Sequence, residues 1–287
     1  MVPLDQPPPS CADQQAFFDG YSATLGAEAG LPPTRLAEYA GRLADRPAWV
    51  FIAGYQAALR QCFPQLRGRP GWASYLVSEA RDESGSATCM LLEDASGLRL
   101  HGTKNWIAAS THLTWLVINA THESGQRSDV LVSATEAGVS LLPKSSGRFL
   151  PELAVGRAEF TEVVIDPSAL LIGEQTHAGL FGLIEARCLL IALAAHFAQL
   201  APLDAPPAEA LLLAEGLVTA ELSSGTSIGV LLDALSMLET WFDHWQDKGL
   251  ASDLPEIKTI RQRWSEDRRL LGMHRGLLEK KLAEQSV

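Results

Sequence analysis

Cysteine is scarce in this sequence, and its spacing excludes two classes of site. The four cysteines, Cys11, Cys62, Cys89 and Cys188, stand far apart among 287 residues and form no C-x-x-C pair. Zinc knuckles and disulfide-stabilised folds need cysteines at recurring short spacings. The seven histidines likewise show no His-x-x-x-His spacing. We therefore expect free thiols and no metal site.

Positive charge is also in short supply. Lys and Arg number 23 against 34 Asp and Glu, which gives a formal net charge of -11. Nucleic acid is an unlikely class of partner for such a chain, because phosphate binding depends on clustered cations. The opening "MVPLDQPPPS" has no basic segment followed by an apolar one, so no secretory signal is expected and a cytoplasmic location is predicted.

Long purely apolar runs are absent as well. The most apolar span, residues 179–201, contains Glu185, Arg187 and His196. Charged side chains at the centre of a bilayer are costly, so this span indicates a buried core helix and no membrane partner.

The chain has 47% hydrophobic residues, and it divides into three segments that differ in their hydrophobic pattern. Residues 1–70 predict a small helical domain, with prolines 32, 33 and 47 at helix starts. Residues 71–172 carry short alternating runs between turn residues, which predict an antiparallel β-barrel or sheet. Residues 173–287 return to three- and four-residue apolar steps, which predict a helical bundle. The fold class expected is α+β.

Four ordered motifs carry a family resemblance. They are "YLVSEARDESGS" from Tyr75, "LRLHGTKNWIAAS" from Leu98, "DVLVSATEAGVSLLP" from Asp129, and "AEFTEVVIDPSALLIGEQTHAGLFGLIEAR" from Ala158. Together they resemble the acyl-CoA dehydrogenase family, and the chain is similar to a shortened, divergent member of it. The best similarity lies between residues 75 and 196, and four matches in order indicate a shared fold.

The resemblance implies an activity and a site. The activity is α,β-oxidation of an acyl thioester, carried by coenzyme A or an acyl-carrier protein, with FAD as electron sink. Ser84 and Arg187 match positions near the substrate. The implied FAD-binding residues are Tyr75, Val77, Ser78, Trp106, Ile107 and Ala108.

Departures from the family pattern open alternatives. The usual C-terminal Tyr-Glu-Gly base is missing, since the last tyrosine is Tyr75, and the alternative base position holds Ala186. Glu185 beside it is the candidate catalytic base. The family's Arg-x-x-Phe-Gly loop has no counterpart after His196, and no Gly-Gly pair is present for the turn that in the family receives the adenine half of FAD. Weak or shared FAD binding is therefore expected. The chain is accordingly either an oligomeric dehydrogenase or a degenerate, FAD-poor subunit pairing with a full-length acyl-CoA dehydrogenase. A third interpretation is a non-redox protein that binds or acts on acyl-carrier-protein-linked groups.

One further motif has two interpretations. "GTSIG", residues 225–229, fits the Gly-x-Ser-x-Gly pattern of a hydrolase nucleophile centred on Ser227. That nucleophile needs a preceding strand, whereas the flanking sequence predicts helix. A helix break with Ser227 as cap of the next helix is the competing interpretation.

Overall fold

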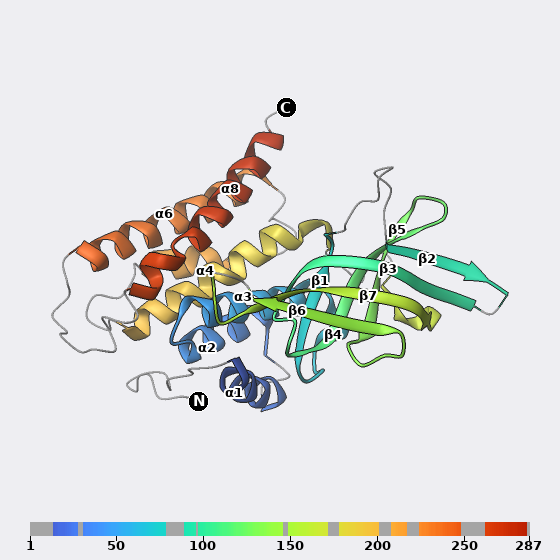
Figure 1. The fold of residues 1–287 in the computed structure, drawn as a ribbon. Coiled ribbons are helices and arrows are strands. Elements are labelled where there is room, and N and C mark those ends of the chain that lie inside the picture. Colours follow the sequence, from blue (N-terminus) through green and yellow to red (C-terminus); the bar gives the residue numbers. More distant parts are fainter. Residues whose placement is uncertain are drawn as a thin grey trace.

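Helices and strands occupy separate parts of the molecule (Figure 1). Helices come first along the chain, then a sheet, then helices again, which confirms the expected α+β order. The domain boundaries at residues 70 and 172 stay predictions. The computed structural model describes residues 14–27, 31–78, 89–95, 97–145, 149–171, 178–200, 208–216, 224–247 and 262–285.

The N-terminal helices are α1 (Gln14–Ala27), α2 (Pro33–Leu43) and α3 (Pro47–Cys62). Proline begins α2 and α3, where its missing N–H loses no helical hydrogen bond and its fixed φ suits the first turn. Gln56 of α3 then binds the backbone of Ala73 twice, accepting from its N–H at 2.9 Å and donating to its carbonyl at 2.8 Å. This amide fixes the first strand of the sheet against α3.

The middle of the chain forms one sheet, ordered β6-β7-β3-β2-β4-β5-β8, with β1 paired to β4 beside this path. Most pairs are antiparallel, as the sequence predicted, but β4 runs parallel to both β1 and β2. Alternating hydrophobicity does not report strand direction, so these two pairs could not be anticipated. The strands are β1 (Trp72–Leu76), β2 (Cys89–Asp94), β3 (Gly97–Ala108), β4 (Leu113–His122), β5 (Arg127–Ser133), β6 (Val139–Ser145), β7 (Ala154–Ile165) and β8 (Leu170–Leu171).

The C-terminal helices are built around α4 (Phe181–Leu200), with α5 (Ala208–Gly216), α6 (Gly225–Asp247) and α8 (Arg269–Glu284) around it. Within the described part of the chain, α4 is the one helix long and apolar enough to cross a membrane, yet most of it is buried inside the molecule. It contacts α2 and α3 as well as α5, α6 and α8, which is the environment of a central core helix.

A close approach of backbones lets α4 lie against the N-terminal helices. A methyl group added to Gly54 of α3 would lie 2.7 Å from the Cα of Leu189 on α4. Gly41 of α2 meets the backbone of Ala192 in the same way. Any larger residue at these two positions would force the helices apart.

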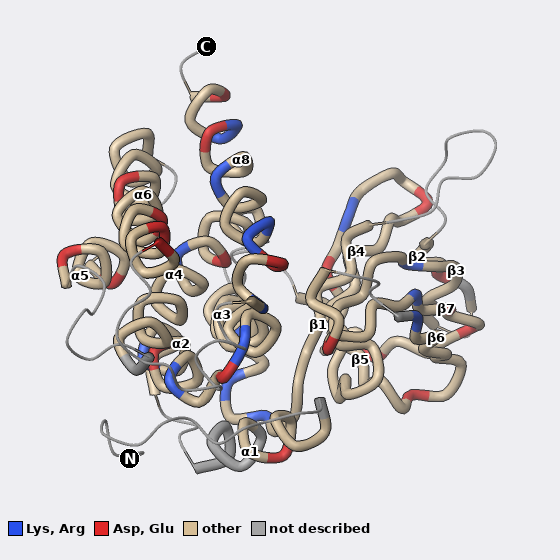
Figure 2. The backbone as a smooth tube through the Cα atoms, turned by 60° about the vertical axis from the view of Figure 1, so that its left-hand side comes forward, with Lys and Arg blue, Asp and Glu red and all other residues tan. Residues whose placement is uncertain are grey.

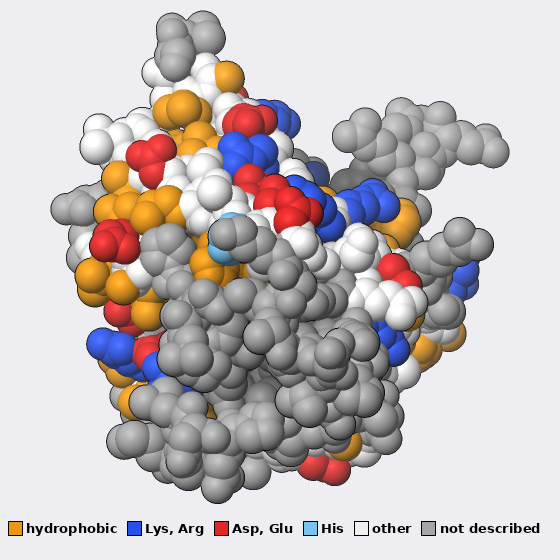
Figure 3. All heavy atoms as spheres, turned by 90° about the vertical axis from the view of Figure 1, so that its left-hand side faces the viewer, with side chains coloured by type: hydrophobic (Ala, Val, Ile, Leu, Met, Phe, Trp, Pro, Cys, Tyr) orange, Lys and Arg blue, Asp and Glu red, His pale blue; other side chains and the backbone are white. Residues whose placement is uncertain are grey.

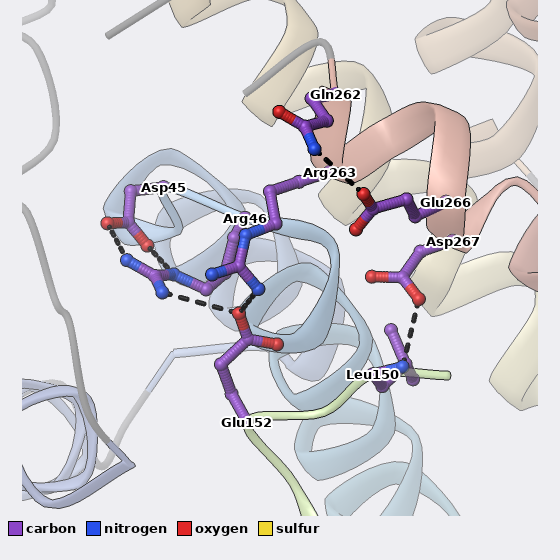
Figure 4. Close-up of polar contacts among 8 residues, drawn as sticks. All are labelled: Asp45, Arg46, Leu150, Glu152, Gln262, Arg263, Glu266 and Asp267. Carbon is purple, nitrogen blue, oxygen red and sulfur yellow. Dashed lines mark hydrogen bonds and ion pairs between the residues drawn. The ribbon is translucent and has the colours of Figure 1, made fainter. Parts of the chain in front are cut away.

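A polar junction joins the loop between β6 and β7 to the helices (Figure 4). The carboxylate of Glu152 pairs with Arg46, at the start of α3, at 3.3 Å, and with Arg263 of the helical segment 262–267. In the same loop Leu150 has φ of 46°, and its N–H donates to Asp267 at 2.9 Å. Three segments distant in sequence are thereby held together.

Candidate functional site

Trp106 stands out because its backbone and its exposure are both unusual. Its φ is 59°, in the left-handed region that bulky residues rarely adopt, and its side chain is 80% exposed. The pairing of β3 with β7 shifts register between Asn105 and Ile107, so Trp106 is the extra residue of a β-bulge. A bulge re-aims a side chain. Here it presents an indole ring outward while Ile107 stays buried in the sheet core.

The end of β1 lies beside this bulge. The N–H of Asn105 donates to the carbonyl of Ser78 at 2.8 Å. The ammonium of the buried Lys104 lies 3.4 Å from the carbonyl of Val77, whose side chain is 43% exposed. Val77, Ser78 and Trp106, predicted from distant motifs, therefore come together, and we call these three residues the tryptophan platform.

A buried polar network surrounds Tyr75, which lies two residues before Val77 of the platform. Asp129 of β5 accepts hydrogen bonds from the hydroxyl of Tyr75 at 3.1 Å and from the amide of Asn119 at 2.9 Å. Burial raises the pKa of Asp129, while the two hydrogen bonds and the charge of Lys104 act in the opposite direction. Burial and the neighbouring carboxylate also raise the pKa of Tyr75. The phenol therefore stays protonated and donates to Asp129.

Glu185 lies near this network, on α4. Phe181, one helical turn earlier on the same face, packs edge-on against Tyr75 with ring centres 5.1 Å apart and against Tyr55 at 5.8 Å. Among the described residues nothing forms a hydrogen bond or ion pair with the half-buried Glu185 carboxylate. Burial raises the pKa of Glu185 to about 7. Burial also raises the pKa of Tyr55, with a smaller contribution from the charge of Glu185. A carboxyl with such a pKa exchanges protons near neutrality.

The elements that carry these groups meet where the helices face the sheet, and Figure 2 shows α3 beside β1 at this boundary. The sheet supplies the platform and Tyr75, while α3 and α4 supply Tyr55, Phe181 and Glu185. The sheet side of this boundary carries the exposed indole, and the helix side carries the aromatic rings and a carboxyl that has no hydrogen bond among the described residues.

Other predicted residues lie differently. Arg187 is 3% exposed and donates to the side chain of Gln61 at 2.6 Å, in the interface between α4 and α3. Ala108 is half-buried and pairs with Val155. Ser84 lies outside the described residues. The functional roles of all three stay predictions.

Two residues of this region were not predicted from the sequence. Asp129 and Phe181 were not singled out, although an acidic residue opening the apolar run "DVLV" is a usable signal for a buried polar contact. The capping role predicted for Ser227 is wrong: Ser227 lies in the first turn of α6 at 4% exposure, and its N–H donates to Ser224 Oγ at 3.2 Å. Ser224 is the cap, because its hydroxyl is the one positioned to accept from the free N–H groups.

Comparison with known proteins identifies this architecture. No protein-family model matches the sequence, and no curated protein matches it. Among solved structures, an acyl-CoA dehydrogenase from Bacillus anthracis complexed with FAD is 16% identical with a TM-score of 0.62, over 91% of this chain and only 58% of that one. TdsC from Paenibacillus sp. A11-2, with FMN and indole, is 13% identical with a TM-score of 0.66, over 96% of this chain and 90% of that one.

A third similar structure is the ChsE4–ChsE5 complex from Mycobacterium tuberculosis. It is 15% identical with a TM-score of 0.56, over 96% of this chain and 88% of that one. Similarity at these identities concerns the path of the backbone. The chain has the fold of the acyl-CoA dehydrogenases, as its sequence motifs implied.

Proposed function

We propose that this protein is a flavin-dependent oxidoreductase that holds the isoalloxazine ring of FAD on the tryptophan platform. The observation that carries the proposal is Trp106, whose exposed ring is presented from a strained backbone. Strain of about 1–3 kcal/mol at a non-glycine residue persists where the surrounding structure imposes it, and such residues cluster at ligand sites.

The residues present fit a flavin in their chemistry. An exposed indole offers a flat apolar surface to a ring, and two of the similar structures named above, the Bacillus anthracis acyl-CoA dehydrogenase and TdsC, contain FAD and FMN respectively. When bound, the flavin supplies the acceptor for a hydride. Trp106 would hold the ring, and the paired ends of β1 and β3 would fix its position.

Glu185 is the proposed proton acceptor. With a pKa of about 7, about half of the Glu185 side chains are ionised at neutral pH. No other side chain among the described residues forms a hydrogen bond or ion pair with this carboxylate. Oxidation of an acyl thioester, the finer reaction implied by the sequence, requires this base and a contact for the thioester carrier. Arg187, predicted for that contact, faces Gln61, so the thioester carrier stays a prediction.

A second candidate function is that of a flavin-poor subunit completing a larger dehydrogenase. The supporting observation is α5, whose Leu212 and Leu213 are 66% and 37% exposed. Figure 3 shows apolar side chains interspersed with acidic ones on the end of the molecule formed by the helices. An exposed apolar helix face is typical of a surface that binds another chain.

Visible spectroscopy tests the first function. The purified protein, or the protein reconstituted with FAD, should show flavin absorbance and quenched flavin fluorescence. We expect Trp106→Ala to weaken FAD binding about tenfold or more, as for loss of a stacking partner worth roughly 1–3 kcal/mol. Val164→Ala, at a residue 63% exposed on the neighbouring strand, is the control and should bind FAD like the parent.

The outcomes separate the two functions. Unchanged FAD binding in Trp106→Ala, equal to that of Val164→Ala, would place the flavin away from the platform. A protein that stays colourless alone and takes up flavin only with a co-expressed acyl-CoA dehydrogenase would favour the subunit function. Bleaching of bound FAD by butyryl-CoA without oxygen would establish the thioester substrate.

A further inference from the structure

The strained backbone of Trp106 lies between two fixed neighbours. On its N-terminal side, the N–H of Asn105 donates to the carbonyl of Ser78 at 2.8 Å. On its C-terminal side, Ile107 pairs with Gly156 of β7. An unfavourable backbone conformation persists only where the surrounding structure imposes it. The position of β7 along β3 is therefore one of the constraints that keep Trp106 in the left-handed region.

The start of β7 fits tightly against the turn that follows β3. The N–H and the hydroxyl of Ser110 both donate to the carbonyl of Ala154, at 3.0 Å and 3.3 Å. A methyl group added to Gly156 would lie 2.7 Å from the Cβ of Ser110 and 2.9 Å from the carbonyl oxygen of Leu142. Such close packing resists a change of register. β7 can shift along β3 only if the chain that leads into it moves as well.

That leading segment, residues 149–153, is anchored in the core of the helices. Leu150 and Leu153 are 5% and 2% exposed and belong to the hydrophobic cluster built mainly from helices. The sheet core begins further on in β7, at Ala158. The N–H of Leu153 donates to the carbonyl of Leu150 at 2.9 Å, which closes a turn between them. The start of β7 is thus held from the helical side of the molecule.

Two carboxylates secure this anchor, as Figure 4 shows. Asp267 is 1% exposed and accepts the N–H of Leu150 at 2.9 Å, where the chain has a φ of 46°. Glu152 pairs with Arg263, which belongs to the same helical segment as Asp267. Loss of the Asp267 acceptor would leave the buried N–H of Leu150 unsatisfied, which is costly. The anchor therefore depends on the carboxylate of Asp267.

We propose that Asp267 and Glu152 are positioning residues for Trp106. The helical segment 262–267 holds residues 149–153, these residues hold β7 in register with β3, and the register keeps the indole turned outward. The coupling between the two places needs no cofactor. Its consequence for flavin binding rests on the proposed function.

A double-mutant cycle measured by urea unfolding tests the coupling. Trp106→Gly removes the strain, so in the parent it should raise the ratio of folded to unfolded protein about fivefold. Asp267→Ala deletes the acceptor for Leu150 and lets Trp106 relax. In that background Trp106→Gly should change the ratio by less than about twofold, whereas changes at independent sites simply add.

Two control backgrounds and a second release variant complete the cycle. Asp267→Asn keeps an acceptor oxygen of the same reach and should restore the gain from Trp106→Gly. Glu279→Gln, at a carboxylate 58% exposed on α8, should also keep that gain. Glu152→Gln serves if Asp267→Ala does not fold, and it should reduce the gain to about twofold. The same gain in every background would overturn the proposal.

FAD titration of these variants separates the positioning role from the flavin function. Where both hold, Asp267→Ala binds FAD about threefold or more weakly, and Asp267→Asn binds it like the parent. Coupled unfolding in a protein that takes up no FAD would reject the flavin function and leave the positioning role in place. FAD binding that depends on Trp106, together with additive unfolding effects, would reject the positioning role alone.

Discussion

At the scale of single residues, Trp106 combines two opposing properties. Its left-handed backbone is unfavourable for any residue with a Cβ, while its exposed ring contributes little to the core. Glycine adopts this conformation without that steric penalty. We therefore expect Trp106→Gly to raise the free energy of unfolding by about 1 kcal/mol and to weaken FAD binding about tenfold or more, as for Trp106→Ala.

Chemical denaturation followed by fluorescence measures the first effect, and FAD titration measures the second. Ala109→Gly is the matched control, because Ala109 also has a positive φ, of 56°, but is buried. It should stabilise the protein without touching flavin binding. A Trp106→Gly variant less stable than the parent would show that the tryptophan ring is held by packing and is not poised for a ligand.

His196 gives a second prediction at this scale. It is fully buried, its Nδ1 lies 2.9 Å from the carbonyl of Ala44, and its Nε2 accepts from Trp264. Burial lowers the pKa of His196 to about 4, below the value of about 6.5 expected in the unfolded chain. The unfolded chain thus binds the proton first. The stability that His196 contributes is complete above about pH 6.5 and is lost toward about pH 4, at about 1.4 kcal/mol per pH unit.

His196→Gln tests this sign, because glutamine can form both hydrogen bonds without titrating. Between about pH 6.5 and 4.5 the variant should lose roughly 2–3 kcal/mol less stability than the parent, following the same linkage. His101→Gln, at an imidazole 56% exposed, should follow the parent curve. Parallel curves for the parent and His196→Gln would contradict the prediction. Urea unfolding at a series of pH values gives the comparison.

At the scale of elements, Glu152 holds the β6–β7 loop to two helical segments. Its side chain is 9% exposed and faces Arg46, itself 13% exposed, and Arg263. Removal of its charge leaves two guanidinium groups without their shared partner, although Arg263 keeps contact with water. We expect Glu152→Gln to lower the free energy of unfolding by about 2 kcal/mol.

Thermal and urea unfolding measure that change. Glu279→Gln removes an exposed partner of Arg275 and should shift stability by less than about 0.5 kcal/mol. A loss as small as this for Glu152→Gln would mean that the loop is held mainly by Leu150, whose side chain is 5% exposed and whose N–H binds Asp267.

The elements also show what the sequence could predict. Runs such as "TWLVINAT" and "AEFTEVVI" lie in β4 and β7, because period-two alternation follows directly from the geometry of a strand. The bulge at Trp106 was not predictable, since it depends on the register between β3 and β7. The same holds for the site. Trp106 and Ser78 were found from motifs, whereas the contact of Tyr75 with Asp129 and Phe181 depends on tertiary packing.

At the scale of the whole molecule, the helices and the sheet each have a hydrophobic core of their own. Aromatic rings from α6 and the segment 262–267 gather around Phe197 of α4, with Trp241 at 4.9 Å and Trp264 at 5.1 Å. Both tryptophans are buried. The sheet has its own core of alternate strand residues. The site lies where these two cores meet, which is a common location for ligand sites.

The central position of α4 also determines when the molecule can fold during its synthesis. The glycines of α2 and α3 pack against a helix that comes more than 130 residues later in the chain, since Gly54 lies against Leu189 and Gly41 against Ala192. Contacts over such separations form slowly, because a long loop must close first. Until the ribosome has released residues 181–200, the faces of α2 and α3 that pack against α4 have no cover and are exposed to chaperones and to aggregation.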